Sequence, residues 1–134
     1  MSKRIALDSN ILVYCHDNRD AKKSYLAVDL LDLSPVVPSQ VVTEYLNVTK
    51  RLFKLSKHEA LDVCLCNLDG CEIQPMGFST LQFAKKLMER YDFQLFDSIV
   101  VALALEADCQ ILYSEDMQHE LVVEKRLKII NPFL

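Results

Sequence analysis

The segment FDSIVVALALEAD, residues 96–108, constrains the fold of this chain more than any other stretch. It is long enough for about three turns of helix, and residues 99–105 are all apolar. A helix that is apolar on nearly every side must be covered by other elements on most of its surface. The rest of the chain therefore has to build layers around this helix.

Short apolar runs alternate with longer helical patterns along the whole chain. Alternation of this kind predicts an α/β domain with a mostly parallel sheet, here of four to five short strands flanked by helices. The predicted strands are 4–7, 35–39, 71–76, 110–114 and 127–131, and the predicted helices are 10–17, 21–33, 39–53, 56–68, 79–91 and 96–108.

Polar residues mark where several of these helices begin. Ser39 is expected to cap the helix that runs to about residue 53. Ser56 and Glu59 have the S-x-x-E spacing of a capping box. Ser79 or Thr80 is expected to begin the helix that ends near residue 91.

Length and charge narrow the class of protein. At 134 residues without repeats or a linker, the chain is expected to form one domain, 1–134. Its formal net charge of −4 argues against a protein that coats nucleic acid with a broad basic surface. A nuclease stays possible, because bound metal ions would supply positive charge locally.

Cysteine usage and hydropathy indicate a compartment. The five cysteines are odd in number and contain no C-x-x-C pair, so they are expected to be reduced apolar fillers rather than disulfides or metal ligands. No signal-peptide pattern opens the chain, and no apolar run is long enough to cross a membrane. The expectation is a cytoplasmic protein with no membrane contact.

Four acidic residues stand out by position: two follow predicted strands, one opens the apolar helix, and Glu44 lies one turn into the helix after the second strand. Each has an ordinary structural explanation: Asp8 as a helix cap, Glu44 as an exposed helix residue, Asp97 as an acid favoured by the helix dipole, and Asp116 as a turn residue. Asp8 and Asp116, however, both follow predicted strands, and ligands bind beyond the carboxyl ends of such strands.

Taken together, the four acids point to a metal site. Asp97 opens the apolar helix and Asp8 ends a buried strand, so neither carboxylate is expected to lie fully in water. Carboxylates gathered in one place repel one another and raise each other's pKa. A hard divalent cation such as Mg²⁺ removes that conflict, and it prefers oxygen ligands.

The turn that follows strand 110–114 holds two adjacent acids. If strand geometry continues through the turn, Ser114 and Asp116 point to one side and Glu115 to the other. Asp116 is therefore expected to matter for metal-dependent activity, and Glu115 much less.

The segments LDSNILVY, SQVVTEYLNV, FDSIVVALALEADCQILYSEDMQH and LKIINPF resemble the PIN-domain ribonucleases, especially the VapC-type toxins of bacterial toxin–antitoxin pairs. The resemblance covers essentially the whole chain. The family's acidic pattern is complete here, and its matching residues are Asp8 with Ser9 and Asn10, Glu44, Asp97, and Ser114 with Asp116.

The resemblance implies a three-layer PIN-like domain and a Mg²⁺- or Mn²⁺-dependent endoribonuclease. It also implies a homodimer inhibited by a VapB-like antitoxin. Asp8, Asp97 and Asp116 would hold metal, directly or through water, and Glu44 would be an outer ligand or a base. Asn10 and Ser114 would position carboxylates or waters by hydrogen bonds.

Further features bear on partners and alternatives. Basic groups at 50–57 and 85–90 are either solvated helix faces or contacts for the RNA backbone. The resemblance implies a groove for an antitoxin segment on one side of the helices, and exposed apolar residues in the helices at 21–53 would fit it. A dehalogenase-type phosphatase is disfavoured because position 10 is Asn. A PIN nuclease outside a toxin–antitoxin pair, and a non-catalytic PIN-like binding module, remain open.

Overall fold

A computed structural model describes residues 3–134 of the chain, so the first two residues of the predicted domain lie outside the described part. Short strands alternate with helices along the sequence, and two helices in succession separate each of the first three strands from the next. The elements are β1 (Ile5–Leu7), α1 (Ser9–Tyr14), α2 (Ala21–Leu31), β2 (Val36–Pro38), α3 (Ser39–Leu52), α4 (Lys57–Leu68), β3 (Glu72–Gln74), α5 (Phe78–Tyr91), α6 (Leu95–Glu106), β4 (Ile111–Tyr113), β5 (Val122–Val123) and β6 (Leu127–Ile130).

The strands form one sheet in the order β3-β2-β1-β4-β6-β5. Every pairing is parallel except that of β5 with β6, which is antiparallel. The predicted α/β class with a mostly parallel sheet is therefore confirmed. The sheet has six strands rather than four to five. The extra strand, β5, has only two residues, too few for alternation to reveal it.

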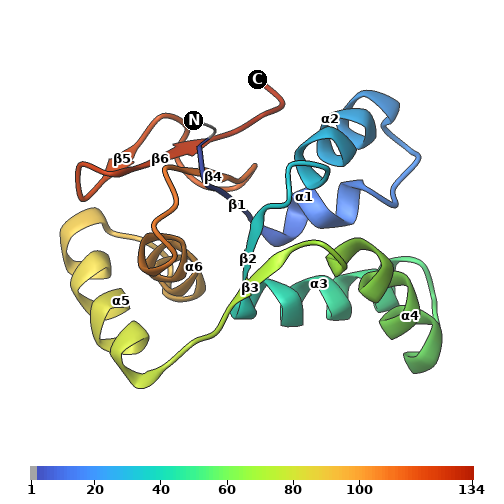
Figure 1. The fold of residues 1–134 in the computed structure, drawn as a ribbon, viewed down its shortest axis with the longest axis horizontal. Coiled ribbons are helices and arrows are strands. Elements are labelled where there is room, and N and C mark those ends of the chain that lie inside the picture. The colour runs from blue at the N-terminus through green and yellow to red at the C-terminus, as the bar shows by residue number, and fades with distance from the viewer. Residues whose placement is uncertain (1–2) are drawn as a thin grey trace.

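Helices cover both faces of the sheet. Figure 1 shows α5 and α6 on one side and α1 and α2 on the other, with α3 and α4 beside α1. The predicted central helix is α6: residues 98–105 are all buried in it, next to α5, α3 and strand β2. The apolar segment is thus covered on most sides, as its composition requires.

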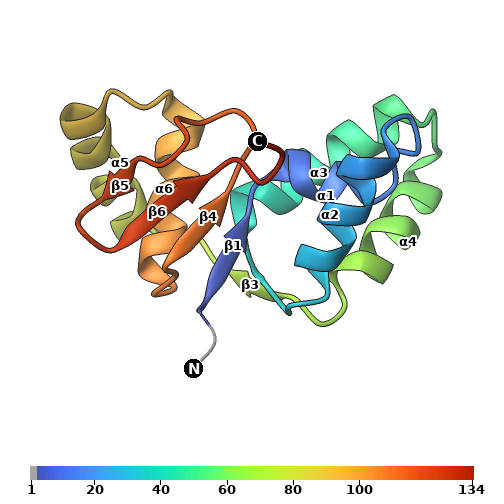
Figure 2. The same cartoon turned by 90° about the horizontal axis from the view of Figure 1, so that it is seen from above.

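The strand order reverses direction at β1. The chain goes from β1 outward to β2 and β3, then returns to place β4 on the opposite side of β1. In Figure 2 the arrowheads of β1, β4 and β6 point to the same edge. Crevices at such a switch point are where open α/β sheets bind their ligands. Asp8 directly follows β1 and Ser114 directly follows β4, so both lie at this point.

Two of the predicted helix starts differ from the structure. The capping box of α4 is present, since Ser56 and Glu59 each accept a hydrogen bond from the other's backbone N–H. Ser39 is not the cap of α3, which begins at Ser39 itself after Pro38. The Ser39 hydroxyl instead accepts a hydrogen bond from the backbone of Met76, 3.1 Å away, and so ties α3 to the loop after β3.

Helix α5 begins at Phe78, with Gly77 as its N-cap, slightly before the predicted start. Glycine has no capping side chain; the hydroxyl of Thr80 accepts a hydrogen bond from the Gly77 N–H at 3.0 Å instead. Thr80 is therefore part of the first turn rather than the residue before it.

All five cysteines are free thiols. Within residues 3–134, no helix combines the length and the apolar character needed to cross a bilayer.

Candidate active site

The register of β1 against β4 brings Asp8 next to Ser114. Leu7 is paired with Tyr113, so the residues that follow them come together where the strands end. The Asp8 N–H donates to the Tyr113 carbonyl, and the Ser114 hydroxyl donates to Oδ2 of Asp8 at 2.7 Å. Both side chains are buried. Asp8 is also the N-cap of α1, and its side chain accepts a hydrogen bond from the Ser9 N–H, so its ordinary structural explanation is confirmed.

Asn10, in α1, links this helix to the turn after β4. Its amide Nδ2 donates to Oδ2 of Asp116 at 2.9 Å, and its Oδ1 accepts from the backbone N–H of Glu115 at 3.3 Å. The Asp116 N–H donates to the Ser114 hydroxyl at 3.2 Å. Asn10 and Ser114 therefore hold both the backbone and the carboxylate of this turn.

Glu44 approaches the same edge from α3. Because β2 is parallel to β1, the helix that follows β2 begins at the edge where Asp8 lies. The hydroxyl of Ser9 donates to Oε2 of Glu44 at 3.0 Å, and the Gln40 amide lies 3.4 Å from Oε1. Sequence reasoning assigned Ser9 no role of its own, although its place between Asp8 and Asn10 was the available signal.

Asp97 lies in the first turn of α6, half-buried. The pKa of its carboxyl is raised, mainly by burial and then by the negative charges of Glu44 and Asp116. The Asp97 carboxylate therefore lies close enough to two other predicted site residues to be repelled by their charges. The structure brings Asp97, Glu44 and Asp116 into one electrostatic environment, although they come from three separate elements.

Asp8 is the most deeply buried of the four acids, with 5% of its surface exposed. Burial raises its pKa to about 6, and the charges of Glu44 and Asp97 push in the same direction. The hydrogen bonds from Ser114 and from the Ser9 N–H oppose this rise, because they favour the charged carboxylate. An acid held in this balance is typical of functional sites.

The four carboxylates fit a hydrated divalent cation rather than a closed cage. Among residues 3–134, no three His, Cys, Asp or Glu side chains are gathered tightly enough to hold a metal ion by themselves. Mg²⁺ does not need such a set, since it keeps several waters and often takes only one or two carboxylates directly. The desolvated, mutually repelling oxygens of Asp8 and Asp97 are donors of the right kind.

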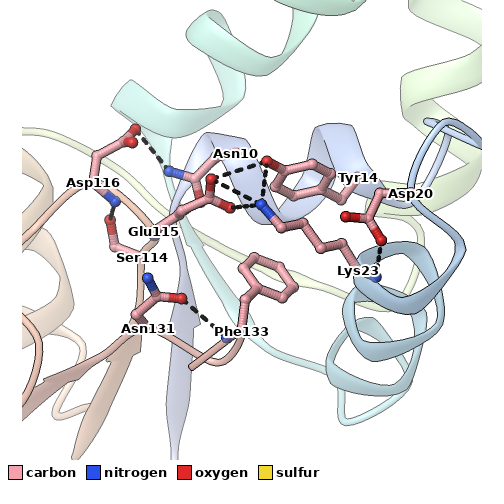
Figure 3. A network of polar contacts seen from close by, with 9 residues as sticks. All are labelled: Asn10, Tyr14, Asp20, Lys23, Ser114, Glu115, Asp116, Asn131 and Phe133. Atoms are coloured by element: carbon pink, nitrogen blue, oxygen red, sulfur yellow. Dashed lines mark hydrogen bonds and ion pairs between the residues drawn. The ribbon is translucent and has the colours of Figure 1, made fainter.

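Glu115 points away from this group, as expected from strand geometry. Figure 3 shows its carboxylate beside Tyr14 and Lys23, on the side opposite to Asp116. The Tyr14 hydroxyl donates to Glu115 at 3.0 Å, and the Lys23 ammonium lies 3.1 Å from the carboxylate. The same ammonium lies 5.2 Å from the ring centre of Phe133. Glu115 thus ties the turn after β4 to α1 and α2, and its partner Lys23 also lies against the C-terminal segment.

Two cavities open onto Asp116 from different sides. One, of about 290 Å³, runs between α1 and α3 and reaches Arg19; its lining is Ser9, Asn10, Val13, Tyr14, Asp17, Arg19, Val48, Leu52 and Asp116. The other, of about 160 Å³, also touches Asp97 and lies near the ends of α5 and β4. A larger cavity of about 500 Å³ shares Asp17, Arg19 and Leu52 with the first, but none of the four acids lines it.

Arg19 is a residue that sequence reasoning missed. Its guanidinium makes two hydrogen bonds to the buried carboxylate of Asp17, at 2.8 and 2.6 Å, while most of the arginine side chain is exposed. An Asp-x-Arg pair is too common to signal a site by itself. The basic groups predicted at 50–57 and 85–90 line neither cavity that touches the acids.

The fold has known counterparts. The toxin VapC20 of Mycobacterium tuberculosis, which cleaves the sarcin–ricin loop, is 16% identical with a TM-score of 0.65, over 82% of this chain and 88% of that one. A toxin–antitoxin complex from Klebsiella pneumoniae is 16% identical with a TM-score of 0.72, over 96% and 97%. VapBC2 of Rickettsia felis, bound to a promoter DNA fragment, is 16% identical with a TM-score of 0.67, over 95% and 98%.

Sequence comparison agrees with this likeness. No curated protein sequence matches the chain significantly. The model of the PIN domain, however, matches residues 5–125, which span every acidic residue described above. The chain belongs to the PIN domain family.

Proposed function

We propose that this chain is a divalent-metal-dependent endoribonuclease, the toxin of a toxin–antitoxin pair, which hydrolyses RNA phosphodiester bonds. The observation that carries the proposal is the meeting of Asp8, Glu44, Asp97 and Asp116 at the switch point of the sheet. Burial and mutual repulsion raise the pKa of Asp8 and of Asp97. Stability alone does not explain why carboxylates that repel one another are gathered at one place in the fold.

Each residue then has a role that its contacts support. Asp8, Asp97 and Asp116 would hold Mg²⁺ or Mn²⁺, directly or through water, and Glu44 would act as an outer ligand or orient the attacking water. Bound there, the ion would supply positive charge to the attacked phosphate and make water a better nucleophile near neutral pH. Ser114 keeps Asp8 in its charged form by a hydrogen bond, and Asn10 fixes the Asp116 carboxylate.

The cavity between α1 and α3 offers a path for the RNA backbone. It leads from Asn10 and Asp116 to Arg19, whose guanidinium is held in place by Asp17. A planar guanidinium fixed on one side by a carboxylate can still donate hydrogen bonds to a phosphate on the other. This arrangement supports a phosphate contact at a protein whose net charge is negative.

The same cavity supports an antitoxin partner. Val13, Val48 and Leu52 form an apolar wall beside the path to the acids. A segment of an antitoxin seated on this wall would exclude RNA by occupying its path. Two of the similar structures are toxin–antitoxin complexes, which adds support for a partner of this kind.

A homodimer is proposed through the edge of the sheet at β3. Exposed apolar side chains follow one another there and into α5: Ile73, Met76, Phe78 and Leu81 are 48, 45, 77 and 45% exposed. A sheet edge with apolar side chains of this kind favours association. Sedimentation of the wild type and of Phe78→Glu tests this: only the wild type should behave as a dimer.

The proposal is tested by cleavage of RNA with Asp97→Asn. Asp62→Asn, which changes an exposed aspartate on α4, is the matched control. Wild type and control should cleave RNA in Mg²⁺ or Mn²⁺ and stop when the ion is chelated, whereas Asp97→Asn should not cleave. Equal activity of all three would contradict the site.

Two alternatives have distinct signatures. A PIN nuclease outside a toxin–antitoxin pair would cleave RNA in the same assay but would not arrest growth when expressed. A non-catalytic PIN-like module would neither cleave nor bind divalent ions, as measured by titration calorimetry. The repelling charges of Asp8, Asp97 and Glu44 favour the metal-binding readings.

A further inference from the structure

We infer that the cavity of about 160 Å³ beside Asp97 is a subsite for one unpaired nucleobase of the RNA, next to the bond that is cut. We call this cavity the base subsite. The inference rests on the proposed ribonuclease function and adds that the enzyme reads a base. The lining residues are Tyr91, Asp92, Phe93, Gln94, Asp97, Asp116, Met117, Gln118 and Leu121.

Position is the first argument. The base subsite shares Asp97 and Asp116 with the proposed catalytic group, so anything within it lies directly beside the reacting phosphate. The cavity that leads to Arg19 also touches Asp116. A single strand that crosses the acids therefore has a hollow on either side of them. The base subsite, at about 160 Å³, is the smaller of the two.

Charge decides which part of a nucleotide enters each hollow. Among the described residues, 3–134, no lysine or arginine lines the base subsite, whereas Asp92, Asp97 and Asp116 do. A phosphate placed there would be repelled, but an uncharged base would not be. The cavity on the other side has Arg19 in its lining. The backbone is thus favoured toward Arg19 and a base toward the base subsite.

The walls have the groups that bind an exposed base. The rings of Tyr91 and Phe93 have centroids 5.7 Å apart. The Tyr91 hydroxyl donates to the Glu124 carboxylate at 3.1 Å and accepts from the Glu124 N–H at 2.9 Å, so this ring is held in place. Aromatic side chains of this kind are the surfaces on which unstacked RNA bases lie.

Polar groups at the rim can distinguish one base from another. Gln94 and Gln118 are exposed, and within residues 3–134 neither side-chain amide makes a hydrogen bond. Each amide presents both a donor and an acceptor to a base edge. Asp92, at φ 57 and ψ 39, ends α5 in a left-handed turn that brings Phe93 and Gln94 into the lining.

The test is cleavage of short single-stranded oligoribonucleotides of randomised sequence, in Mg²⁺ or Mn²⁺, with the product ends sequenced. Gln118→Ala and Phe93→Ala are compared with wild type and with Gln110→Ala, an exposed glutamine far from both cavities. A second substrate series carries an abasic residue at each position flanking the cut. Circular dichroism checks that each variant is folded. If Phe93→Ala does not fold, Gln118→Ala alone carries the test, because Gln118 is exposed and its replacement should not disturb the fold.

The wild type and Gln110→Ala should prefer certain bases at one flanking position. Phe93→Ala should lose on the order of tenfold to a hundredfold in kcat/KM on the preferred base, the range for base–aromatic stacking. On the abasic substrate Phe93→Ala and wild type should be equal. Gln118→Ala should change which base is preferred.

Three results would overturn the inference. If wild type cleaves but shows neither a base preference nor a loss on abasic RNA, no base is read. If Phe93→Ala and Gln118→Ala both keep the wild-type cleavage profile and rate, the cavity holds no base. If wild type does not cleave any RNA with either ion, the proposed function itself fails, and the base subsite with it.

Discussion

The hydroxyl of Ser114 donates a hydrogen bond of 2.7 Å to Oδ2 of Asp8, a residue 106 positions earlier in the chain. Both side chains are buried, and each follows the last residue of a central parallel strand. This contact fixes the neighbouring ends of β1 and β4 at the switch point of the sheet. The same hydrogen bond lowers the pKa of Asp8, whereas the burial of this carboxyl raises it.

Ser114→Ala should shift the pH dependence of RNA cleavage. The hydrogen bond lowers the pKa of Asp8 against the effect of burial, so its loss should raise that pKa above about 6. The acidic limb of the rate profile should then move to higher pH, by roughly one unit for a bond to a charged group. Ser114→Thr keeps the hydroxyl and should keep the profile. Superimposable profiles for Ser114→Ala and wild type would contradict the assignment.

Asp8→Asn should stabilise the metal-free protein near neutral pH. The pKa of Asp8 is about 6 in the folded chain against an ordinary 3.8, so the folded state binds more protons between these values. Stability contributed by this group is therefore greatest at low pH and falls as pH rises from about 4 to about 6. The charged carboxylate then costs about 3 kcal/mol at pH 7, and an amide avoids that cost.

Urea unfolding in chelator at several pH values measures this effect. The difference between Asp8→Asn and wild type should be large at pH 7.5 and should vanish near pH 4. Asp62→Asn, on the surface of α4, should show no such dependence. A variant that is less stable than wild type at pH 7.5 would mean that the contacts of the carboxylate outweigh its burial.

Divalent ions should stabilise the wild-type chain by occupying the acidic group. Binding to the folded state alone adds about 2.7 kcal/mol at an ion concentration a hundredfold above Kd. The melting temperature should therefore rise with Mg²⁺ or Mn²⁺ and should rise much less in Asp97→Asn. Because this readout needs no RNA, it separates metal binding from catalysis. An equal rise in both proteins would place the ion elsewhere.

Asp116→Ala and Glu115→Ala should differ although the residues are adjacent. Asp116 faces Asn10 and the acidic group, so its loss should reduce metal-dependent cleavage strongly. Glu115 is paired with Lys23 and Tyr14, partly exposed, so its loss should cost at most about 1 kcal/mol of stability and little activity. Cleavage and thermal unfolding of both variants check this. Equal losses of activity would mean that the turn acts as one unit.

The layout of the sheet could be predicted because its determinants are local. Apolar runs, the all-apolar helix and the capping box of Ser56 with Glu59 each depend on near neighbours in sequence. Asp8 and Asp116 could be assigned to one edge because both follow predicted strands, and parallel strands share their carboxyl ends. Glu44 and Asp97 lie in helices, and mainly the resemblance to the family's acidic pattern groups them with these two acids. The hydrogen bond from Ser9 to Glu44 could not be predicted, because it depends on the packing of α1 against α3. The pairing of Arg19 with Asp17 is local, but nothing in the sequence marks it as part of a site, because its place beside the cavity depends on the folded chain. Strand β5 was too short to leave a pattern.

Arg19→Gln should weaken RNA binding and make it less dependent on salt. A lysine or arginine that contacts one phosphate contributes about one unit to the slope of log affinity against log salt, so the slope should fall by about that amount. Arg51→Gln, from the basic group at 50–57, is the matched control and should leave the slope unchanged. Arg19→Lys should keep the slope but bind less tightly, because lysine lacks the bidentate fork.

Binding is measured by fluorescence anisotropy with Asp97→Asn as the background, so that the RNA stays intact. A reduced slope for Arg51→Gln alone would move the backbone contact from the cavity at Arg19 to the exposed face of α3.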